Sequence, residues 1–224
     1  MTLTNVTLAQ QAMPLYPGDI PNSLAAPDQE SLRDRDPNDP YLFYQNISRP
    51  QIYPFLLANT KSPRAAIVIL PGGSYRGVSI VKEGFDVAKQ LNEYGIVAFV
   101  VKYRTPSDKH MRDKTIGSLQ DAQQALRLVR SRAKEWNVDP TRVGLMGFSA
   151  GGHLASTAAT RFKEPVIEGA TSEQVKPDFL MLGYPVISFE DSIAHAVSRE
   201  SLLGNRPSRD QIEKYSIDRH VTAQ

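Results

Sequence analysis

The sequence predicts an α/β protein in which helices cover both faces of a mostly parallel sheet. Three observations support this prediction. Short β-branched runs alternate with helical stripes of apolar residues, glycine-rich turns follow two of the runs, and 224 residues are enough for one substantial core. We expect a single domain over residues 1–224, with an extended segment and first strand over 1–60 and the sheet core over 65–224.

The N-terminal part is expected to be mostly extended. Residues 13–50 are rich in Pro, Asp and Asn, and the apolar run 51–58 predicts a first strand that Pro54 would confine to a sheet edge. The run Ala-Ala-Ile-Val-Ile-Leu at 65–70 is typical of a strand buried on both faces. A helix then follows, with four apolar residues on one face and a glycine that favours its end, at Phe85, Ala88, Leu91, Tyr94 and Gly95.

The second half of the chain repeats this alternation. Residues 96–101 predict a buried strand. Ser118 to Asp121 have the spacing of an N-terminal capping box, and an apolar stripe continues from there to Trp136. Further strands are expected at 142–147 and 179–187, and further helices at 150–161, 189–203 and near Gln211. Strands and helices in this order form parallel pairs through right-handed crossovers.

Composition excludes several classes of function. Net charge is +2, and no cluster of Lys and Arg alternates with aromatic residues, so nucleic-acid binding is not expected. The absence of cysteine excludes disulfides, thiolate catalysis and cysteine-bound metals. No apolar run is long enough to span a membrane, and Met1 to Ala12 lack the features of a signal peptide. The location stays open between the cytoplasm and secretion with the signal removed.

The strongest motif is Gly147-Phe148-Ser149-Ala150-Gly151, which joins a predicted buried strand to a predicted helix. A nucleophile elbow requires this context, because its strained turn has no room for side chains at the glycines and lifts the serine above the sheet edge. Charge that develops there meets free N–H groups and the positive end of the helix dipole. We expect Ser149 to be a nucleophile; the alternative is a small-residue turn without chemistry.

A second glycine-rich segment, Pro71-Gly72-Gly73-Ser74-Tyr75, follows an earlier central strand. At that point of the topology its backbone N–H groups would face the space above Ser149. Gly72 and Gly73, together with Ala150, are therefore the candidate oxyanion-hole donors, each typically worth about 3 kcal/mol in acyl transfer. A phosphate-binding loop is the other function of such a turn, but neither G-x-G-x-x-G nor a P-loop lysine pattern is present.

The elbow with its continuation Gly152-His153-Leu154-Ala155, and Leu70 with the loop that follows it, resemble bacterial α/β-hydrolase esterases of the acetyl-xylan-esterase-like group. Further matching segments are Lys82-Glu83-Gly84, Tyr103-Arg104, Gly-Tyr-Pro-Val-Ile-Ser at 183–188 and Ser-Arg-Glu-Ser-Leu-Leu-Gly at 198–204. Pro71 stands where related enzymes have His, and Ser74 where a third Gly is common. The resemblance runs from about Met13 onward. It implies hydrolysis of short acyl esters, often acetyl groups on sugars, with neither a metal nor an organic cofactor.

The general base is not evident in the sequence. In this fold the acid and the histidine follow the serine on loops after later strands. Beyond Phe189 the sequence predicts helices, a turn and a tail, so the sheet is expected to lack its C-terminal strands. His110 is expected in a solvated loop, and His220 lies in a tail without a strand to hold it. Asp178, Asp191 and Asp218 are available acids, but nothing places them behind a histidine, and Asp121 is explained by its capping box.

Five other residues are candidates for the substrate pocket. They are Ser74, Tyr75, His153, Tyr184 and His195. His153 matches a position that the resembling family uses for packing or hydrogen bonding near the site, so we do not expect it to be the base. His195 lies in a family-like segment where it could line a pocket.

We expect a serine carboxylic-ester hydrolase that acts on short-chain, chiefly acetyl, esters through a Ser149 acyl-enzyme. Its partners would be a small-molecule or carbohydrate ester and either a second copy or a complementing C-terminal fragment. A truncated fragment, a natural truncation that pairs with a second chain, and a degenerate non-catalytic module all explain the missing acid and histidine. The fragment is favoured because losing the last strands would expose an apolar sheet edge. A peptidase is disfavoured, because the chain has no room for the propeller or large cap of that group.

Overall fold

The computed structural model describes residues 11–33 and 42–222, so 1–10, 34–41 and 223–224 are not discussed further. The expectation that Met1 to Ala12 are not a signal peptide falls almost entirely on residues outside this description. No helix in the described part of the chain is long and apolar enough to cross a membrane.

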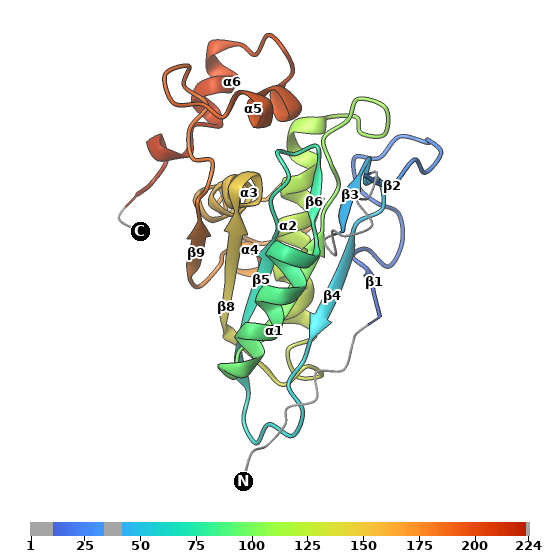
Figure 1. Cartoon of the computed structure of the whole chain (residues 1–224). Coiled ribbons are helices and arrows are strands. Elements are labelled where there is room, and N and C mark those ends of the chain that lie inside the picture. Colours follow the sequence, from blue (N-terminus) through green and yellow to red (C-terminus); the bar gives the residue numbers. More distant parts are fainter. Residues whose placement is uncertain (1–10, 34–41, 223–224) are drawn as a thin grey trace.

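A six-stranded sheet forms the centre of the molecule (Figure 1). In spatial order its strands are β1 (Met13–Pro14), β4 (Gln51–Phe55), β7 (Val97–Lys102), β5 (Arg64–Leu70), β8 (Val138–Phe148) and β9 (Leu180–Gly183). The four strands from β7 to β9 are parallel, whereas β4 and β1 run antiparallel to their neighbours. The prediction of a mostly parallel sheet is confirmed.

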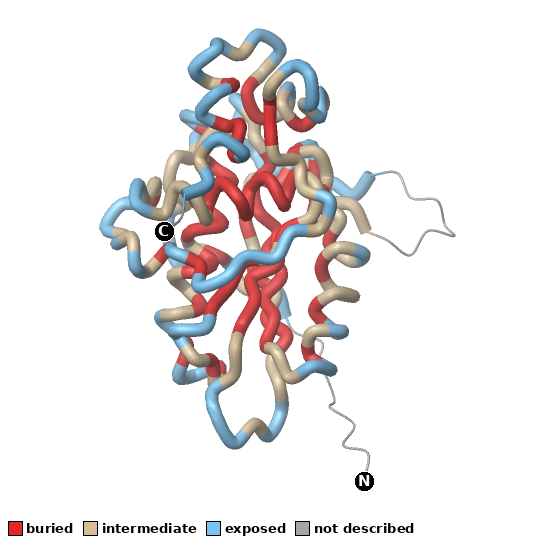
Figure 2. Tube along the Cα trace, turned by 90° about the vertical axis from the view of Figure 1, so that its left-hand side faces the viewer, coloured by how far each residue is buried: buried red, intermediate tan, exposed pale blue. Residues whose placement is uncertain are grey.

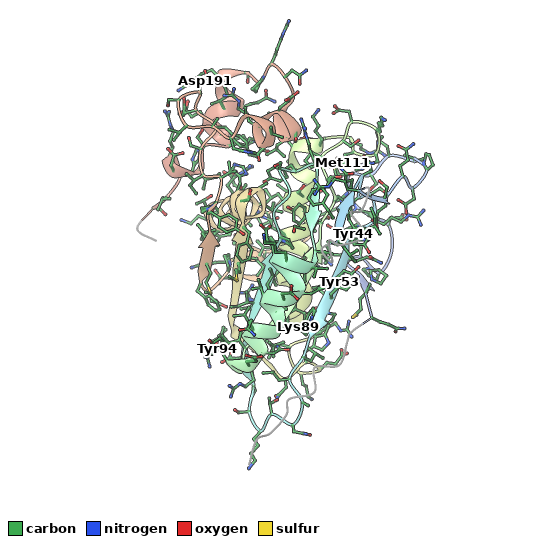
Figure 3. The ribbon with its side chains drawn as sticks, viewed as in Figure 1. Tyr44, Tyr53, Lys89, Tyr94, Met111 and Asp191 are labelled. Atoms are coloured by element: carbon green, nitrogen blue, oxygen red, sulfur yellow. The ribbon has the colours of Figure 1, made fainter. Side chains whose placement is uncertain are left out.

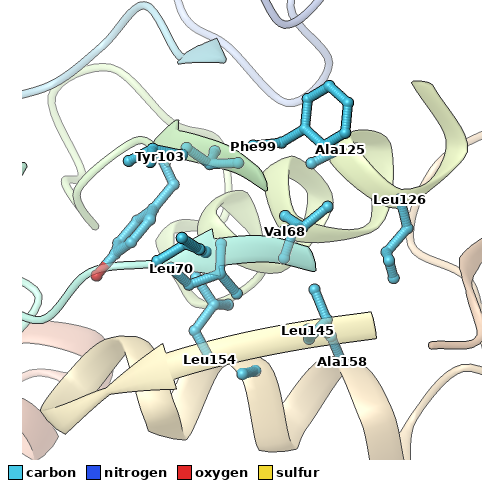
Figure 4. Close-up of a cluster of buried hydrophobic side chains, with 14 of the residues drawn as sticks. Val68, Leu70, Phe99, Tyr103, Ala125, Leu126, Leu145, Leu154 and Ala158 are labelled. Atoms are coloured by element: carbon cyan, nitrogen blue, oxygen red, sulfur yellow. The ribbon is translucent and has the colours of Figure 1, made fainter. Parts of the chain in front are cut away.

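Helices cover both faces of this sheet, as predicted. Helix α1 (Asp86–Glu93) lies in front of the strands in Figure 1, whereas α2 (Lys114–Ser131) passes behind them and packs against α3 (Ser149–Thr160). The buried residues gather between these layers (Figure 2). The core includes Val68, Phe99 and Leu145 of three adjacent strands, with Leu126 of α2 and Ala158 of α3 (Figure 4). The β-branched runs of the sequence are these central strands.

The sequence did not predict a second, three-stranded sheet. It consists of β2 (Ser31–Leu32), β3 (Phe43–Gln45) and β6 (Gly77–Ser79), all antiparallel. These strands have two or three residues each, too few to show the alternation by which a strand is recognised in a sequence. The sheet joins the N-terminal segment to the chain just after the glycine-rich loop.

The C-terminal region lies over the carboxyl ends of the parallel strands (Figure 1). It contains α5 (Ala196–Leu203), α6 (Arg209–Lys214) and the 3₁₀ turn η2 (Ile217–Arg219), and the short helix α4 (Ser172–Val175) precedes β9. The predicted strand 179–187 stops at Gly183, since Tyr184 has a positive φ of 34° and Pro185 has no N–H to donate. The helix predicted at 189–203 begins only at Ala196.

Helix α2 begins four residues before the predicted capping box. Its N-cap is Asp113, whose carboxylate accepts a hydrogen bond from the Thr115 N–H at 2.8 Å. Ser118 and Asp121 are buried inside the helix instead. Ser118 donates to the Arg104 carbonyl at 2.7 Å, and Asp121 forms an ion pair with the Arg104 guanidinium at 2.8 Å. The capping-box prediction is wrong because both polar residues serve contacts across the fold.

Two expectations about individual residues also fail. Tyr94 does not share the buried face of α1, because the helix ends at Glu93 and Tyr94 is 77% exposed (Figure 3). Strand β4, with Pro54, does not form the edge of the sheet, because β1 lies outside it. That outer strand pairs only with Gln51 and Ile52, short of the proline.

Strand β9 forms the other edge of the sheet within the described residues. A parallel strand is usually buried on both faces. The apolar side chains of β9 and the residue before it are instead 36% to 42% exposed, at Phe179, Leu180, Met181 and Leu182. This edge of the described sheet is therefore apolar and partly exposed.

Candidate active site

Ser149 lies on the tight turn between β8 and α3. Its φ is +50°, which is rare for a residue with a side chain and indicates backbone strain that the surrounding structure maintains. A Cβ on Gly147 would overlap the Gly151 carbonyl, and one on Gly151 would overlap the carbonyl of Leu70. The turn is therefore possible only with glycine at both positions, as the sequence predicted.

The glycine-rich loop 71–75 lies directly against the serine. A Cβ placed on Gly72 would lie 2.9 Å from Ser149 Cβ and 2.8 Å from the Phe148 carbonyl oxygen. The next residues continue in left-handed backbone conformations, with φ of 148° at Gly73, 56° at Ser74 and 58° at Tyr75. The fold thus brings together two segments that are separated by about a third of the chain.

A carboxylate that the sequence analysis did not single out holds this loop. Glu83 accepts a hydrogen bond from the Gly72 N–H at 2.7 Å and another from the Tyr184 hydroxyl at 2.8 Å. It lies in a π-helical turn, η1 (Val81–Phe85), a geometry that is rare and often found at functional sites. The Gly72 N–H is therefore already bonded in this structure.

Two tyrosine hydroxyl groups also hold the loop in place, one from outside the loop and one from within it. Tyr103 donates to the Pro71 carbonyl at 2.6 Å, and the buried Tyr75 contacts His153 Nδ1 at 2.8 Å. The other ring nitrogen of His153 lies 2.8 Å from the Tyr215 carbonyl. Because a carbonyl only accepts, Nε2 carries the proton and Nδ1 accepts from Tyr75. Burial lowers the pKa of His153 to about 4, so the ring is neutral at physiological pH.

Tyr184 and the residues after it border the serine on the side of β9. The Val186 N–H donates to the Ser149 carbonyl at 3.0 Å, and the Tyr184 ring packs on Phe148 with centroids 5.6 Å apart. Desolvation, followed by the hydrogen bond to Glu83, raises the pKa of Tyr184 to about 12. Among the candidate pocket residues, Tyr184 thus lies beside the turn that carries Ser149. Tyr75 and His153 are buried supports of the loop.

None of the four histidines, all of which the structure describes, forms a hydrogen bond with Ser149. His195 caps α5 by accepting from the Ser198 N–H at 3.3 Å, and His220 Nε2 lies 2.9 Å from the Glu213 carbonyl. His110 is half-buried with both ring nitrogens inaccessible and unbonded among the described residues, so the expectation of a solvated histidine is wrong. Burial, then the nearby Arg104, lowers its pKa.

Two of the three available acids form ion pairs with arginines. Asp178 pairs with Arg130 at 2.9 Å, and Asp191 pairs with Arg199. Asp218 lies in the η2 turn. No group of three or more His, Asp or Glu side chains in the described ranges is arranged to hold a metal ion. What the described residues assemble is a strained serine beside a glycine-rich loop.

Two residues that hold the loop, Glu83 and Tyr103, were quoted only as part of the resemblance and were given no role. A carboxylate followed by a glycine just before an amphipathic helix is too common a pattern to indicate a site. A tyrosine directly after a buried strand, such as Tyr103, is likewise too common a pattern to indicate a site. Their roles depend on distance in space, which single-sequence patterns do not report.

Comparison with known proteins agrees with this geometry. The family model described as BD-FAE matches residues 52–212. The acetylxylan esterase of Xylanibacter ruminicola is 41% identical over 158 residues, which are 70% of this chain and 30% of that protein. Endo-1,4-beta-xylanase B of Butyrivibrio fibrisolvens is 29% identical over 77% of this chain and 27% of its own length. The chain thus spans less than a third of the length of these two curated relatives.

Solved structures resemble the chain over most of its length. The acetyl ester-xyloside bifunctional hydrolase from Caldicellulosiruptor lactoaceticus has a TM-score of 0.73 at 32% identity, covering 97% of this chain and 72% of that one. Thermogutta terrifontis esterase 2 shares the fold, with a TM-score of 0.62 at 24% identity over 93% of this chain and 70% of its own. The predicted fold and the resemblance to acetyl-xylan-esterase-like α/β-hydrolases are confirmed.

Proposed function

Because the chain belongs to the BD-FAE family and has the α/β-hydrolase fold, we propose that it supplies the nucleophile and oxyanion hole of a carboxylic-ester hydrolase. Its substrates are short acyl esters, chiefly acetyl esters of carbohydrates. The observation that carries this proposal is the close approach of Gly72 to Ser149, because it places a loop of backbone donors beside a strained serine.

The chemistry is acyl transfer through a covalent intermediate. Ser149 Oγ attacks the ester carbonyl carbon and loses its proton to a base, and the carbonyl oxygen becomes an oxyanion. The Gly73 and Ala150 N–H groups receive that charge, each contributing about 3 kcal/mol of transition-state stabilisation. The C–O bond to the sugar then breaks, and the sugar leaves as an alcohol after taking up a proton. Water hydrolyses the acyl-serine to the free acid.

Glu83 supports the oxyanion hole without receiving the charge itself. By holding the Gly72 N–H at 2.7 Å it keeps that donor out of the hole and fixes the peptide units that follow. Gly73 and Ala150 are therefore the donors that we assign. The Tyr103 bond to Pro71 holds the same loop from the side of β7.

The base comes from a polypeptide that pairs along β9. This proposal is supported by the exposed apolar side chains of that edge and by the bonding of the histidines, none of which contacts Ser149. A complementing C-terminal segment or a second copy could pair there. Either would continue the sheet at the edge nearest the serine, since β9 is adjacent to β8.

Covalent labelling of the serine tests the proposal. A fluorophosphonate probe is expected to label the chain, alone or extended by the segment that follows it in the reading frame, and Ser149→Ala is expected to abolish labelling. Hydrolysis of p-nitrophenyl acetate by the extended protein is expected to fall by at least a thousandfold in the same variant. If neither protein reacts with the probe, the proposal is wrong.

A non-catalytic module of the same fold is the second candidate. The observation in its favour is that no histidine in the described residues forms a hydrogen bond with Ser149. Without an adjacent base a serine is a poor nucleophile. Ester turnover that disappears in Ser149→Ala would exclude this candidate. Stable folding and ligand binding without turnover, in the extended protein as well, would support it.

A further inference from the structure

A small hollow lies at the end of the sheet opposite Ser149. Its volume is about 230 Å³, and it is lined by residues 62–65 at the start of β5, residues 94–96 after α1, and Arg142 of β8. Strands β5 and β8 are parallel, and β8 ends directly before Ser149, so the hollow lies far from the nucleophile (Figure 1). Because substrates of open parallel sheets bind outside the carboxyl ends of the strands, a ligand held here would not be the ester.

One arginine of this hollow is held in a fixed position. Arg64 Nε donates to the Gly95 carbonyl at 2.9 Å. A Cβ on Gly95 would lie 2.3 Å from Arg64 Nη2, so the guanidinium packs directly on this glycine, whose φ is +73°. Neither Nη atom of Arg64 forms a hydrogen bond with the residues that the structure describes. Four of the five N–H donors of this guanidinium are therefore left for a ligand.

The second arginine comes from the neighbouring strand. Val143 pairs with Ala66, so Arg142 and Arg64 lie on adjacent strands, and both line the hollow. Arg142 is exposed, and within the described part of the chain its guanidinium forms no hydrogen bond or ion pair. The carboxylate of Asp139 bonds instead to the N–H and the hydroxyl of Thr141, at 3.0 Å and 2.7 Å. Two positive charges thus share the hollow, and none of its lining residues is a carboxylate.

The loop before β5, which forms one wall of the hollow, is held in place by Asn137. The Asn137 amide donates to the carbonyls of Thr60 and Ser62 at 3.1 Å and 3.2 Å. The Asn137 carbonyl in turn accepts a hydrogen bond from the Arg64 N–H at 2.9 Å. The wall is therefore formed before any ligand binds, which lowers the entropic cost of binding.

We propose that this hollow binds a phosphate group, as the free ion or as a small phosphate monoester. Two guanidinium groups on different strands offer planar forks of donors, the geometry that recognises phosphate. A single fork satisfies the two oxygens of a carboxylate, whereas the additional oxygens and charge of a phosphate make use of both arginines. The hydroxyl groups of Ser62 and Tyr94, which also line the hollow, are neutral donors for the remaining oxygens. The proposal does not depend on ester hydrolysis.

Isothermal calorimetry on the full chain tests this proposal. Inorganic phosphate, glycerol 3-phosphate and acetate are titrated separately, at an ionic strength held constant with chloride. The test variant is Arg142→Ala, which removes an exposed side chain without a bond to the described residues. The matched control is Arg206→Ala, an exposed arginine in the C-terminal region over the other end of the sheet (Figure 1). Thermal melting checks that each variant is folded.

We expect inorganic phosphate to bind and to raise the melting temperature by about 2 °C at saturating concentration. Arg142→Ala should raise its Kd at least tenfold, Arg206→Ala should leave the Kd unchanged, and acetate should bind at least tenfold more weakly. Equal binding of glycerol 3-phosphate would identify a monoester as a ligand, and its failure to bind would identify the free ion. Absence of binding by both phosphates, equal binding by Arg142→Ala, or equally tight binding of acetate would overturn the proposal.

Discussion

At the residue scale, Glu83 connects the glycine-rich loop to the segment that follows β9. Its two carboxylate oxygens bond separately, one to the Gly72 N–H and the other to the Tyr184 hydroxyl. The π-helical turn around it places this side chain under the loop. The carboxylate thus determines which N–H groups of the loop stay available to an oxyanion.

Replacing Glu83 by Gln is expected to slow acylation of Ser149. The amide lacks the negative charge that holds the Gly72 N–H, so the loop loses its charge-assisted bond. We expect fluorophosphonate labelling to slow about tenfold, less than the hundredfold or more for loss of a direct oxyanion donor. Rates are measured by gel fluorescence over time, with Asp86→Asn on α1 as the control. Equal rates for Glu83→Gln and wild type would contradict this role.

At the scale of elements, His153 joins three parts of the molecule. It lies on α3, bonds to Tyr75 in the glycine-rich loop, and bonds to the Tyr215 carbonyl at the end of α6. Its ring also stacks on Phe189, with centroids 4.4 Å apart. The neutral ring therefore fixes the C-terminal region over the site, and burial disfavours the charged form of this ring.

This arrangement predicts that acid weakens the fold through His153. The pKa falls from 6.5 to about 4 on folding, so the unfolded chain takes up the proton first. Stability is complete above pH 6.5 and is lost as the pH falls toward 4. The loss from this group is about 3 kcal/mol. In urea unfolding, the advantage of wild type over His153→Gln should shrink by that amount across this range.

The control for this measurement is His220→Gln, which removes a histidine from the C-terminal tail. Its stability profile should run parallel to that of wild type over the same pH range. A constant difference between wild type and His153→Gln at all pH values would show that the buried histidine does not contribute to the acid sensitivity.

At the scale of the whole molecule, the exposed edge at β9 is the main unpaired surface of the described sheet. Its Leu180 and Leu182 lie on one face and Met181 on the other, since side chains alternate along a strand. An apolar edge of this kind invites pairing with another strand. The position beside β8 makes it the edge through which a partner would reach Ser149.

Introducing a positive charge on β9 is expected to prevent self-association of the protein through this edge. We expect wild type to form concentration-dependent dimers or larger species in sedimentation velocity, and Met181→Lys to shift it toward monomer. The control is Tyr94→Lys, which alters a residue that is 77% exposed on the far end of α1. A wild-type protein that stays monomeric at all concentrations would exclude pairing between copies along β9.

Several parts of the fold were predictable because their causes are local. The runs at 65–70, 96–101 and 142–147 became β5, β7 and β8, since consecutive β-branched residues indicate a strand wherever it lies. The elbow was predictable in part because the steric reason at Gly147 acts within a few residues: a Cβ there would overlap the Gly151 carbonyl. The reason at Gly151 is tertiary, since a Cβ there would overlap the Leu70 carbonyl. The capping-box prediction for α2 was wrong because its causes are not local. Ser118 and Asp121 have capping spacing, but their partner is Arg104 in another element.

The sequence by itself determined the order of strands and helices, the strained turn at Ser149 and the family of the chain, because these depend on neighbouring residues and on motif spacing. Tertiary structure alone decided that Gly72 contacts Ser149, that Glu83 occupies one N–H of the loop, and that the histidines form their hydrogen bonds with residues other than Ser149. It also decided that β9 is exposed. The physical reason is that hydrogen bonds and burial depend on distances between residues far apart in the chain, which periodicity and spacing do not encode.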